Sequence, residues 1–152
     1  MEQYFFGRHL KRNRLFDKGT AACLLLILMY LSGCAHVLGA ITYFDPTTYK
    51  NLTDLKPEVT ALYDTFTGDT VDNGQISAIC LKLAQMYEYE KGKGEKNKET
   101  YTQIRIIQTM FEKHVSDRLR DGKWSMTHAN NQKETIAEAF DIAIKTEALK
   151  NK

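Results

Sequence analysis

The sequence has little proline, little cysteine and no excess of charge of either sign. Only two prolines and three cysteines occur among its 152 residues, together with a single tryptophan. No segment alternates apolar and polar residues over the length of a strand, and this absence argues against a β-sheet protein. Few prolines and no strand pattern indicate that the chain is mainly helical.

The charge balance excludes one class of function. Residues 34–152 hold 16 basic and 17 acidic side chains, so this part of the chain is nearly neutral. A nucleic-acid-binding domain needs a concentrated basic surface, and we therefore expect no nucleic-acid partner. The overall excess of basic residues comes from the first 33 positions.

Those first positions have the organisation of a secretory signal. A basic segment, "RHLKRNRLFDK", precedes eleven uncharged residues, "AACLLLILMYL", and small residues follow. This order is typical of an export signal with a cleavage site at its end. The residues at the end are Leu31, Ser32, Gly33 and Cys34.

These four residues match every position of the lipobox and resemble the signal of bacterial lipoproteins. The resemblance implies cleavage between Gly33 and Cys34 and attachment of a diacylglyceryl group to the Cys34 sulfur. Two or more acyl chains anchor a protein stably in a membrane, whereas one chain does so only marginally. Ala35 follows the cysteine, and in a diderm bacterium this resembles lipoproteins that reach the outer membrane and face the periplasm.

A transmembrane anchor is the alternative interpretation of the same region. Residues 21–44 contain no Asp, Glu, Lys or Arg over 24 positions, and about 20 apolar residues suffice to span a bilayer. Both interpretations leave the basic N-terminus in the cytoplasm and the rest of the chain outside.

The chain therefore divides into a signal peptide (1–33), a short apolar tether (34–44) and a helical domain (45–152). Tyr43 and Phe44 end the tether and are candidate interaction residues, since aromatic rings are favoured at the headgroup level of a membrane. Packing of the tether on its own domain is the alternative.

Four amphipathic helices are expected in the domain: from Asp45 to Gly68, and over about 72–91, 98–120 and 126–149. Asp45 and Asp72 are suited to cap the first two, and Pro57 should kink the first helix or mark a second start. Short connections favour an all-α antiparallel bundle of about four helices, with two stacked helical hairpins as the alternative. The third helix should bury Tyr101, Ile104, Ile107, Phe111, Val115 and Leu119, and the fourth Ile136, Phe140, Ala143, Ile144 and Ala148.

No catalytic or metal-binding motif was found. The histidines lack the spacing of a zinc or di-iron site, so we expect no metal and no cofactor. His114 is expected at the surface or at the boundary of the core. Cys80 is expected to be a small buried apolar residue.

Trp124, in the connection before the last helix, is the remaining candidate interaction residue. An exposed tryptophan would be the first choice for a binding hot spot, and the alternative is a hydrophobic plug at the end of the bundle.

These observations predict a lipid-anchored protein of the bacterial cell envelope. Its domain is expected to be a non-catalytic binding or scaffolding module, with the membrane lipid bound through acylated Cys34 and a protein partner in the envelope. A bundle that binds a small ligand is the alternative, and an envelope enzyme is less favoured.

Overall fold

The computed structural model describes residues 43–151. The predicted lipidation and cleavage residues, Cys34 and Gly33, lie outside this range. The described residues form four α-helices and two short 3-10 turns, with no strand among them beyond an isolated bridge between Tyr43 and Asn151. The predicted all-α helical bundle is thus confirmed.

The helices begin and end close to the predicted positions. The four α-helices are α2 (Pro46–Asp64), α3 (Asn73–Gly92), α4 (Lys98–Asp121) and α5 (Met126–Ala148), and the turns are η2 (Thr65–Thr67) and η3 (Glu95–Asn97).

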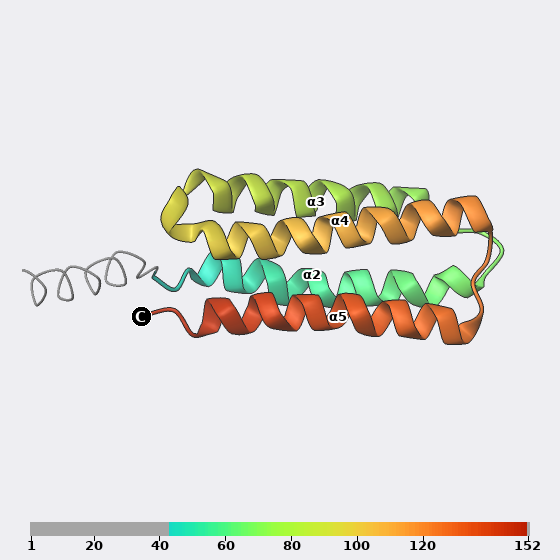
Figure 1. Cartoon of the computed structure of the whole chain (residues 1–152). Helices are drawn as coiled ribbons and strands as arrows, with labels where there is room; N and C mark the ends of the chain where they lie inside the picture. Colours follow the sequence, from blue (N-terminus) through green and yellow to red (C-terminus); the bar gives the residue numbers. More distant parts are fainter. Residues whose placement is uncertain (1–42, 152) are drawn as a thin grey trace, which may run out of the picture. The chain divides into compact units, whose positions relative to one another are not determined.

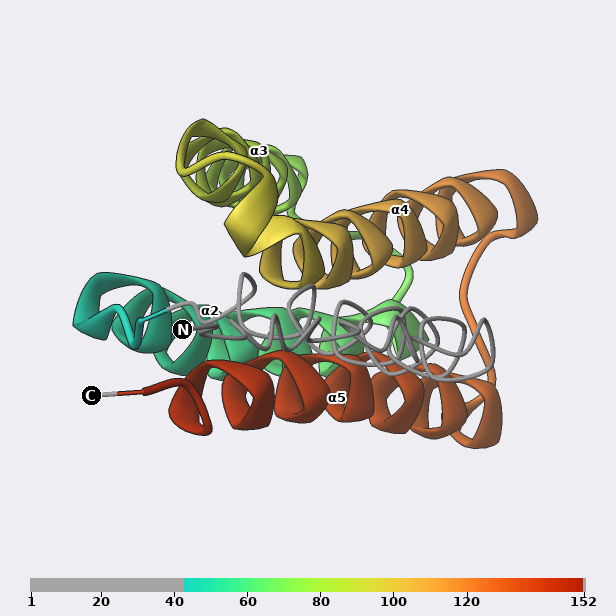
Figure 2. The ribbon, with the colours of Figure 1, turned by 60° about the vertical axis from the view of Figure 1, so that its left-hand side comes forward.

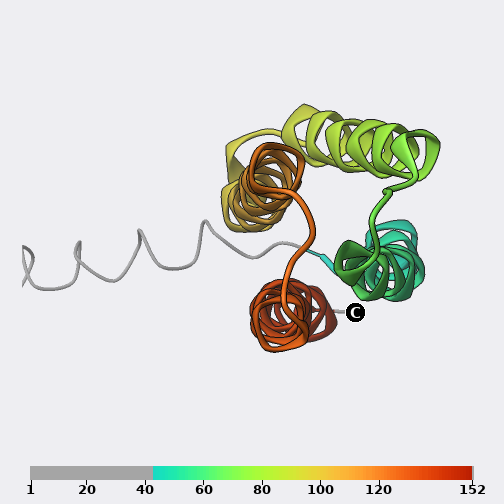
Figure 3. The same cartoon turned by 90° about the vertical axis from the view of Figure 1, so that its right-hand side faces the viewer.

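Consecutive helices are antiparallel neighbours (Figure 1). The view along the bundle shows α2, α4 and α5 nearly end-on, with α3 lying across them (Figure 3). Helix α3 is inclined to the other three, since it is seen nearly end-on where they are seen lengthwise (Figure 2). We call the end that contains the start of α2 and the end of α5 the entry end. The distal end contains the connections 65–72 and 122–125.

Side-chain caps explain why three of the four helices begin where they do. The Asp45 carboxylate accepts from the Thr47 and Thr48 backbone amides, Asp72 accepts from Gln75, and the Ser125 hydroxyl accepts from the amide of residue 128. Such caps supply partners for amides that have none within the helix.

Pro57 neither ends α2 nor starts a second helix, because one helix runs through it. Proline lacks an amide hydrogen, so the carbonyl of Thr53 loses its usual helical donor. Pro57 lies on the solvent-exposed face of α2, where water can hydrogen-bond to that carbonyl. Leu55 and Val59, two residues before and after it, are buried and keep the helix packed on the core.

One hydrophobic core lies between the four helices. Two of the core positions predicted for α4 and α5 are exposed instead: Leu119 is 55% exposed, and Ala148 also faces solvent. The preceding residue takes the buried position in each case, because Arg118 is 4% exposed and Glu147 is 0% exposed, so Leu119 and Ala148 point outward. The fully buried large side chains include Tyr63, Phe66, Phe111 and Phe140.

None of the helices formed by residues 43–151 combines the length and the apolar character that a membrane crossing requires.

Candidate functional site: a buried polar network at the entry end

Two carboxylates lie at core positions of the entry end. Glu90 is 1% exposed and Glu147 is 0% exposed. On α3, Glu90 follows Met86 by four residues, and on α5, Glu147 follows Ala143 by the same step. Each carboxylate therefore extends the apolar face of its helix into the bundle. Buried carboxylates are costly unless they are paired and hydrogen-bonded.

Glu90 is satisfied by three other side chains. Its Oε1 accepts from the hydroxyl of Thr48 and from the ammonium of Lys93, whose Nζ lies 2.7 Å away. Its Oε2 accepts from the side-chain amide of Asn97. Helix α2, the end of α3 and the turn η3 are joined through this one carboxylate.

Asp45 binds the same lysine from the start of α2. Its Oδ1 caps the helix, and its Oδ2 accepts from the Tyr89 hydroxyl at 2.8 Å and from Lys93. Partial burial opposes ionisation of Asp45, but the hydrogen bonds from Lys93, Tyr89 and Thr47 outweigh it and hold its pKa well below the ordinary value. Burial likewise disfavours the charged form of Lys93, but its bonds to Asp45 and Glu90 raise its pKa.

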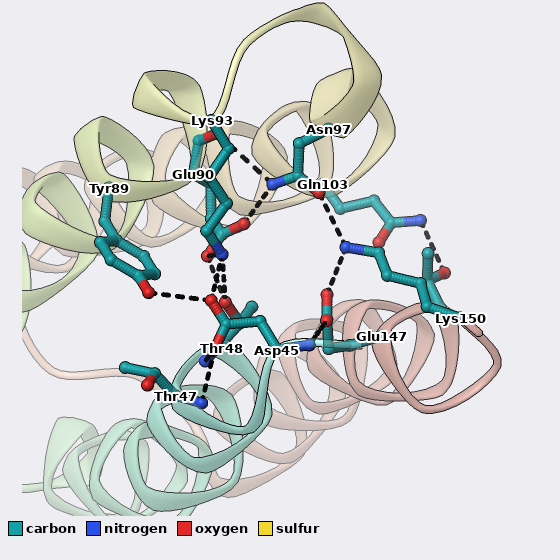
Figure 4. Close-up of polar contacts among 11 residues, drawn as sticks. Asp45, Thr47, Thr48, Tyr89, Glu90, Lys93, Asn97, Gln103, Glu147 and Lys150 are labelled. Atoms are coloured by element: carbon teal, nitrogen blue, oxygen red, sulfur yellow. Dashed lines mark hydrogen bonds and ion pairs between the residues drawn. The ribbon is translucent and has the colours of Figure 1, made fainter. Parts of the chain in front are cut away.

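Glu147 connects α5 to the start of α2 (Figure 4). Its Oε1 accepts from the backbone amide of Asp45 at 2.7 Å, and its Oε2 lies 2.6 Å from the Nζ of Lys150. The Lys150 ammonium also donates to the Oδ1 of Asn97 at 2.8 Å. Asn97 thus joins the two carboxylates, since its amide nitrogen binds Glu90.

We call these eight residues the entry network: Asp45, Thr48, Tyr89, Glu90, Lys93, Asn97, Glu147 and Lys150. Every carboxylate oxygen in it accepts a hydrogen bond from within the protein except the Oε2 of Glu147, which has only its ion pair with Lys150. Removal of one member of a buried ion pair typically costs about 3–5 kcal/mol, because the other charge is left without a partner. The network therefore fixes the first residues of the domain to the end of α3, to the turn η3 and to the end of α5.

The backbone on either side of Asp45 is fixed as well. The amide of Phe44 donates to the carbonyl of Asn151 at 2.8 Å. The ring of Phe44 lies 5.8 Å from that of Tyr49. Phe44 thus packs on its own domain, whereas Tyr43 is 76% exposed. The two predicted tether residues therefore differ in environment.

Trp124 plugs the distal end and is not an exposed hot spot. Its side chain is only 7% exposed, and its ring lies 5.1 Å from Phe66 and 4.4 Å from His128, centroid to centroid. Its backbone amide donates to the carbonyl of Phe66 at 2.9 Å. The interaction role expected for an exposed Trp124 does not fit this position.

His114 is buried, contrary to the expectation of a surface or boundary residue. It is 7% exposed, and its Nδ1 lies 2.7 Å from the hydroxyl of Tyr63. Burial raises the pKa of Tyr63, so the phenol keeps its proton and shares a hydrogen bond with the imidazole. Burial, together with the charge of Lys113, lowers the pKa of His114.

An open groove of about 470 Å³ lies between α2 and α3. Its floor contains the buried Leu55 and Met86, and its walls are polar, with Asn51 and Gln85 among them.

Within residues 43–151, no three His, Cys, Asp or Glu side chains are grouped so as to hold a metal ion. Cys80 is half-buried, and burial followed by the charge of Glu112 raises the pKa of its thiol.

Comparisons with known proteins gave no relative. No protein-family model, no curated protein and no solved structure matches the chain.

Proposed function

We propose that the chain is a lipid-anchored protein of the bacterial cell envelope, whose helical bundle is a non-catalytic scaffolding module held close to the membrane. The lipobox at residues 31–34 supplies the anchor in this proposal. Eight residues lie between Cys34 and Tyr43, which makes nine residue steps, and even a fully extended chain spans only about 3.3–3.6 Å per step. The entry end therefore stays within roughly 30 Å of the lipid.

One observation carries the scaffolding part of the proposal. The entry network and the bond from Phe44 to Asn151 fix the bundle to the first residues after the tether. A protein that only needed to float on a flexible linker would not require buried ion pairs at this point. The arrangement suits a module that presents a protein partner at a fixed height above the membrane.

The anchor is tested by the intact mass of the membrane-extracted protein. We expect wild type to begin at Cys34 and to carry two or three acyl chains, and Cys34→Ser to lose them. Cys23→Ser is the matched control, because this cysteine lies in the same leader outside the lipobox. An unmodified full-length mass for wild type would instead assign residues 21–44 to a transmembrane anchor.

A bundle that binds a small ligand is the second candidate, and the groove between α2 and α3 favours it. Its apolar floor and its free amide groups are the features of a small-molecule site. A shift of the amide resonances of Asn51 and Gln85 upon addition of an envelope extract of small molecules would support this function. Unchanged resonances would contradict ligand binding in this groove and favour the scaffolding proposal.

A further inference from the structure

The ammonium of Lys150 lies between a carboxylate and a carboxamide in the interior of the entry end (Figure 4). Its Nζ is 2.6 Å from the Oε2 of Glu147 and 2.8 Å from the Oδ1 of Asn97. The same Oε2 accepts no hydrogen bond, so its contact is the ion pair with Lys150. Lys93 differs, because it binds two carboxylates and a hydroxyl but no amide. At Lys150, an amine, a base and a side-chain amide thus meet.

The side-chain amide of Asn97 has one orientation in this network. Its Nδ2 donates to the carboxylate of Glu90, which can only accept, and its Oδ1 accepts from Lys150, which can only donate. A carbonyl bond is about 1.23 Å long, so the Lys150 Nζ lies within about 4 Å of the Asn97 Cγ. Atoms poised to react are about 3–3.5 Å apart, and the flexible stem of a lysine allows so small a movement.

Burial favours a reaction between these groups. Asn97 is 4% exposed, and the side chains of Lys150 and Glu147 are 7% and 0% exposed. Water, the competing nucleophile, is therefore largely excluded. Burial also disfavours both charges of the ion pair, and transfer of one proton from the ammonium to the carboxylate removes both at once.

We infer that Lys150 and Asn97 react with each other to form an isopeptide bond, with Glu147 as the base. Glu147 takes one proton from the ammonium and frees the lone pair of Nζ. Nζ then attacks Cγ, its second proton moves to Nδ2, and the bond between Cγ and Nδ2 breaks. The products are a secondary amide, one molecule of ammonia and protonated Glu147, so no oxidant or second substrate is needed.

The bond would join the turn η3 to the end of α5 covalently. The entry end of the bundle could then not open between these two elements, even when its noncovalent contacts break. The ion pair of Lys150 with Glu147 is the state before the reaction, and its stability is measured before the bond has formed. The inference goes beyond the proposed function and does not depend on the lipid anchor.

The experiment is a peptide map of the full-length protein, which is incubated folded at neutral pH, then unfolded and digested with trypsin. Trypsin cleaves after unmodified lysine and arginine, so Asn97 leaves in the fragment 97–98, and Lys150 leaves in a fragment that begins at Thr146. We expect one species in which the two fragments are joined, lighter than their sum by one ammonia. Wild type incubated in urea should not gain this species, because the three side chains meet only in the fold.

Three variants test the roles of the side chains. Lys150→Arg keeps a cation but offers no amine, and Glu147→Gln keeps an acceptor for the backbone amide of Asp45 but removes the base. Both are expected to lose the joined species completely. Lys145→Arg changes an exposed lysine of the same helix, is the matched control and should keep it.

The digest of wild type decides the inference even where a variant does not fold. Separate fragments of unchanged mass after incubation of the folded protein would overturn it. Loss of ammonia from the fragment 97–98 alone would also overturn it, because Asn97 would then have cyclised onto its own backbone as a succinimide. A joined species that persists in Glu147→Gln would support the bond and overturn the role of Glu147 as its base.

Discussion

The buried pair of Glu147 and Lys150 makes a sharp prediction about the stability of the bundle. The two side chains are 0% and 7% exposed, so neither charge is well hydrated in the folded state. Lys150→Met would leave the Glu147 carboxylate with only the amide of Asp45, and Glu147→Leu would leave the Lys150 ammonium with only Asn97. Each single variant is expected to lose about 3–5 kcal/mol of unfolding free energy.

The double variant Glu147→Leu with Lys150→Met should be more stable than either single variant. No unpaired charge then remains, and the loss reduces to the hydrogen bonds to Asp45 and Asn97, at about 1 kcal/mol each. Small domains have unfolding free energies of about 5–15 kcal/mol, so these differences are measurable by urea denaturation. Trp124 fluorescence would follow the distal end, and far-ultraviolet circular dichroism would follow the helices.

The exposed pair of Lys113 and Asp117 provides the control. The Lys113 side chain is 70% exposed, and Lys113→Met should cost less than about 1 kcal/mol. A double variant at Glu147 and Lys150 whose loss equals the sum of the two single losses would refute the reasoning, because the pair would then have no coupling. Amide exchange at Asp45 should accelerate in Glu147→Leu but not in Lys113→Met.

Three further predictions concern other parts of the bundle. Because the pKa of His114 is lowered in the folded state, the unfolded chain protonates this histidine first as the pH falls below about 6.5. The unfolding free energy should therefore fall with pH at up to about 1.4 kcal/mol per pH unit. Urea titrations of His114→Gln should lack this pH-dependent loss. Trp124→Ala should cost about 3–5 kcal/mol by calorimetry, whereas the exposed Tyr43→Ala should cost less than about 0.5 kcal/mol, and equal losses would contradict the assigned burial. Pro57→Ala should stabilise the protein by about 1–3 kcal/mol in thermal unfolding, because it restores an amide donor to the Thr53 carbonyl, and a destabilised variant would contradict this account.

The helices were predictable because their signals are local. Asp72 caps α3 where the sequence suggested, and Gly122 follows α4 with a positive φ of 79°. Glycine reaches this backbone conformation without strain, so its position after an apolar-faced segment marks a helix end. The periodicity also assigned most of the core, and it failed at Leu119, because the buried face of α4 continues through Arg118, whose guanidinium donates to the carbonyls of Phe66 and Gly68.

The sequence analysis did not predict the entry network, although the pattern of apolar residues in α3 indicates the burial of one of its carboxylates, Glu90. The series Ile76, Ile79, Leu83, Met86 and Glu90 advances by three or four residues, so a carboxylate occupies the last core position of α3. That pattern predicts a buried glutamate and hence a basic partner. It does not predict which lysine serves, because Lys93 and Lys150 are surrounded by other lysines in the sequence and only the three-dimensional arrangement selects them.

Trp124 shows a second limit of sequence reasoning. Its burial depends on a backbone bond from its own amide to the carbonyl of Phe66, which belongs to the other connection of the distal end. Contacts between two loops carry no periodic signal. The choice between an exposed and a buried tryptophan therefore could not be made from the pattern of either loop.

The adjacent position of residues 43 and 151 makes the domain suitable for circular permutation. Since Phe44 and Asn151 share a hydrogen bond, a short peptide could join the two ends, and new termini could be opened at Gly122 in the distal connection. In the proposed lipid-anchored protein, fusing the leader to the new first residue would place the distal end of the bundle next to the lipid in place of the entry end. Such an inverted protein would keep its core and its surfaces, but each surface would lie at a different distance from the lipid. Comparing it with the natural order would show whether function depends on the partner-binding surface itself or on the distance of that surface from the membrane.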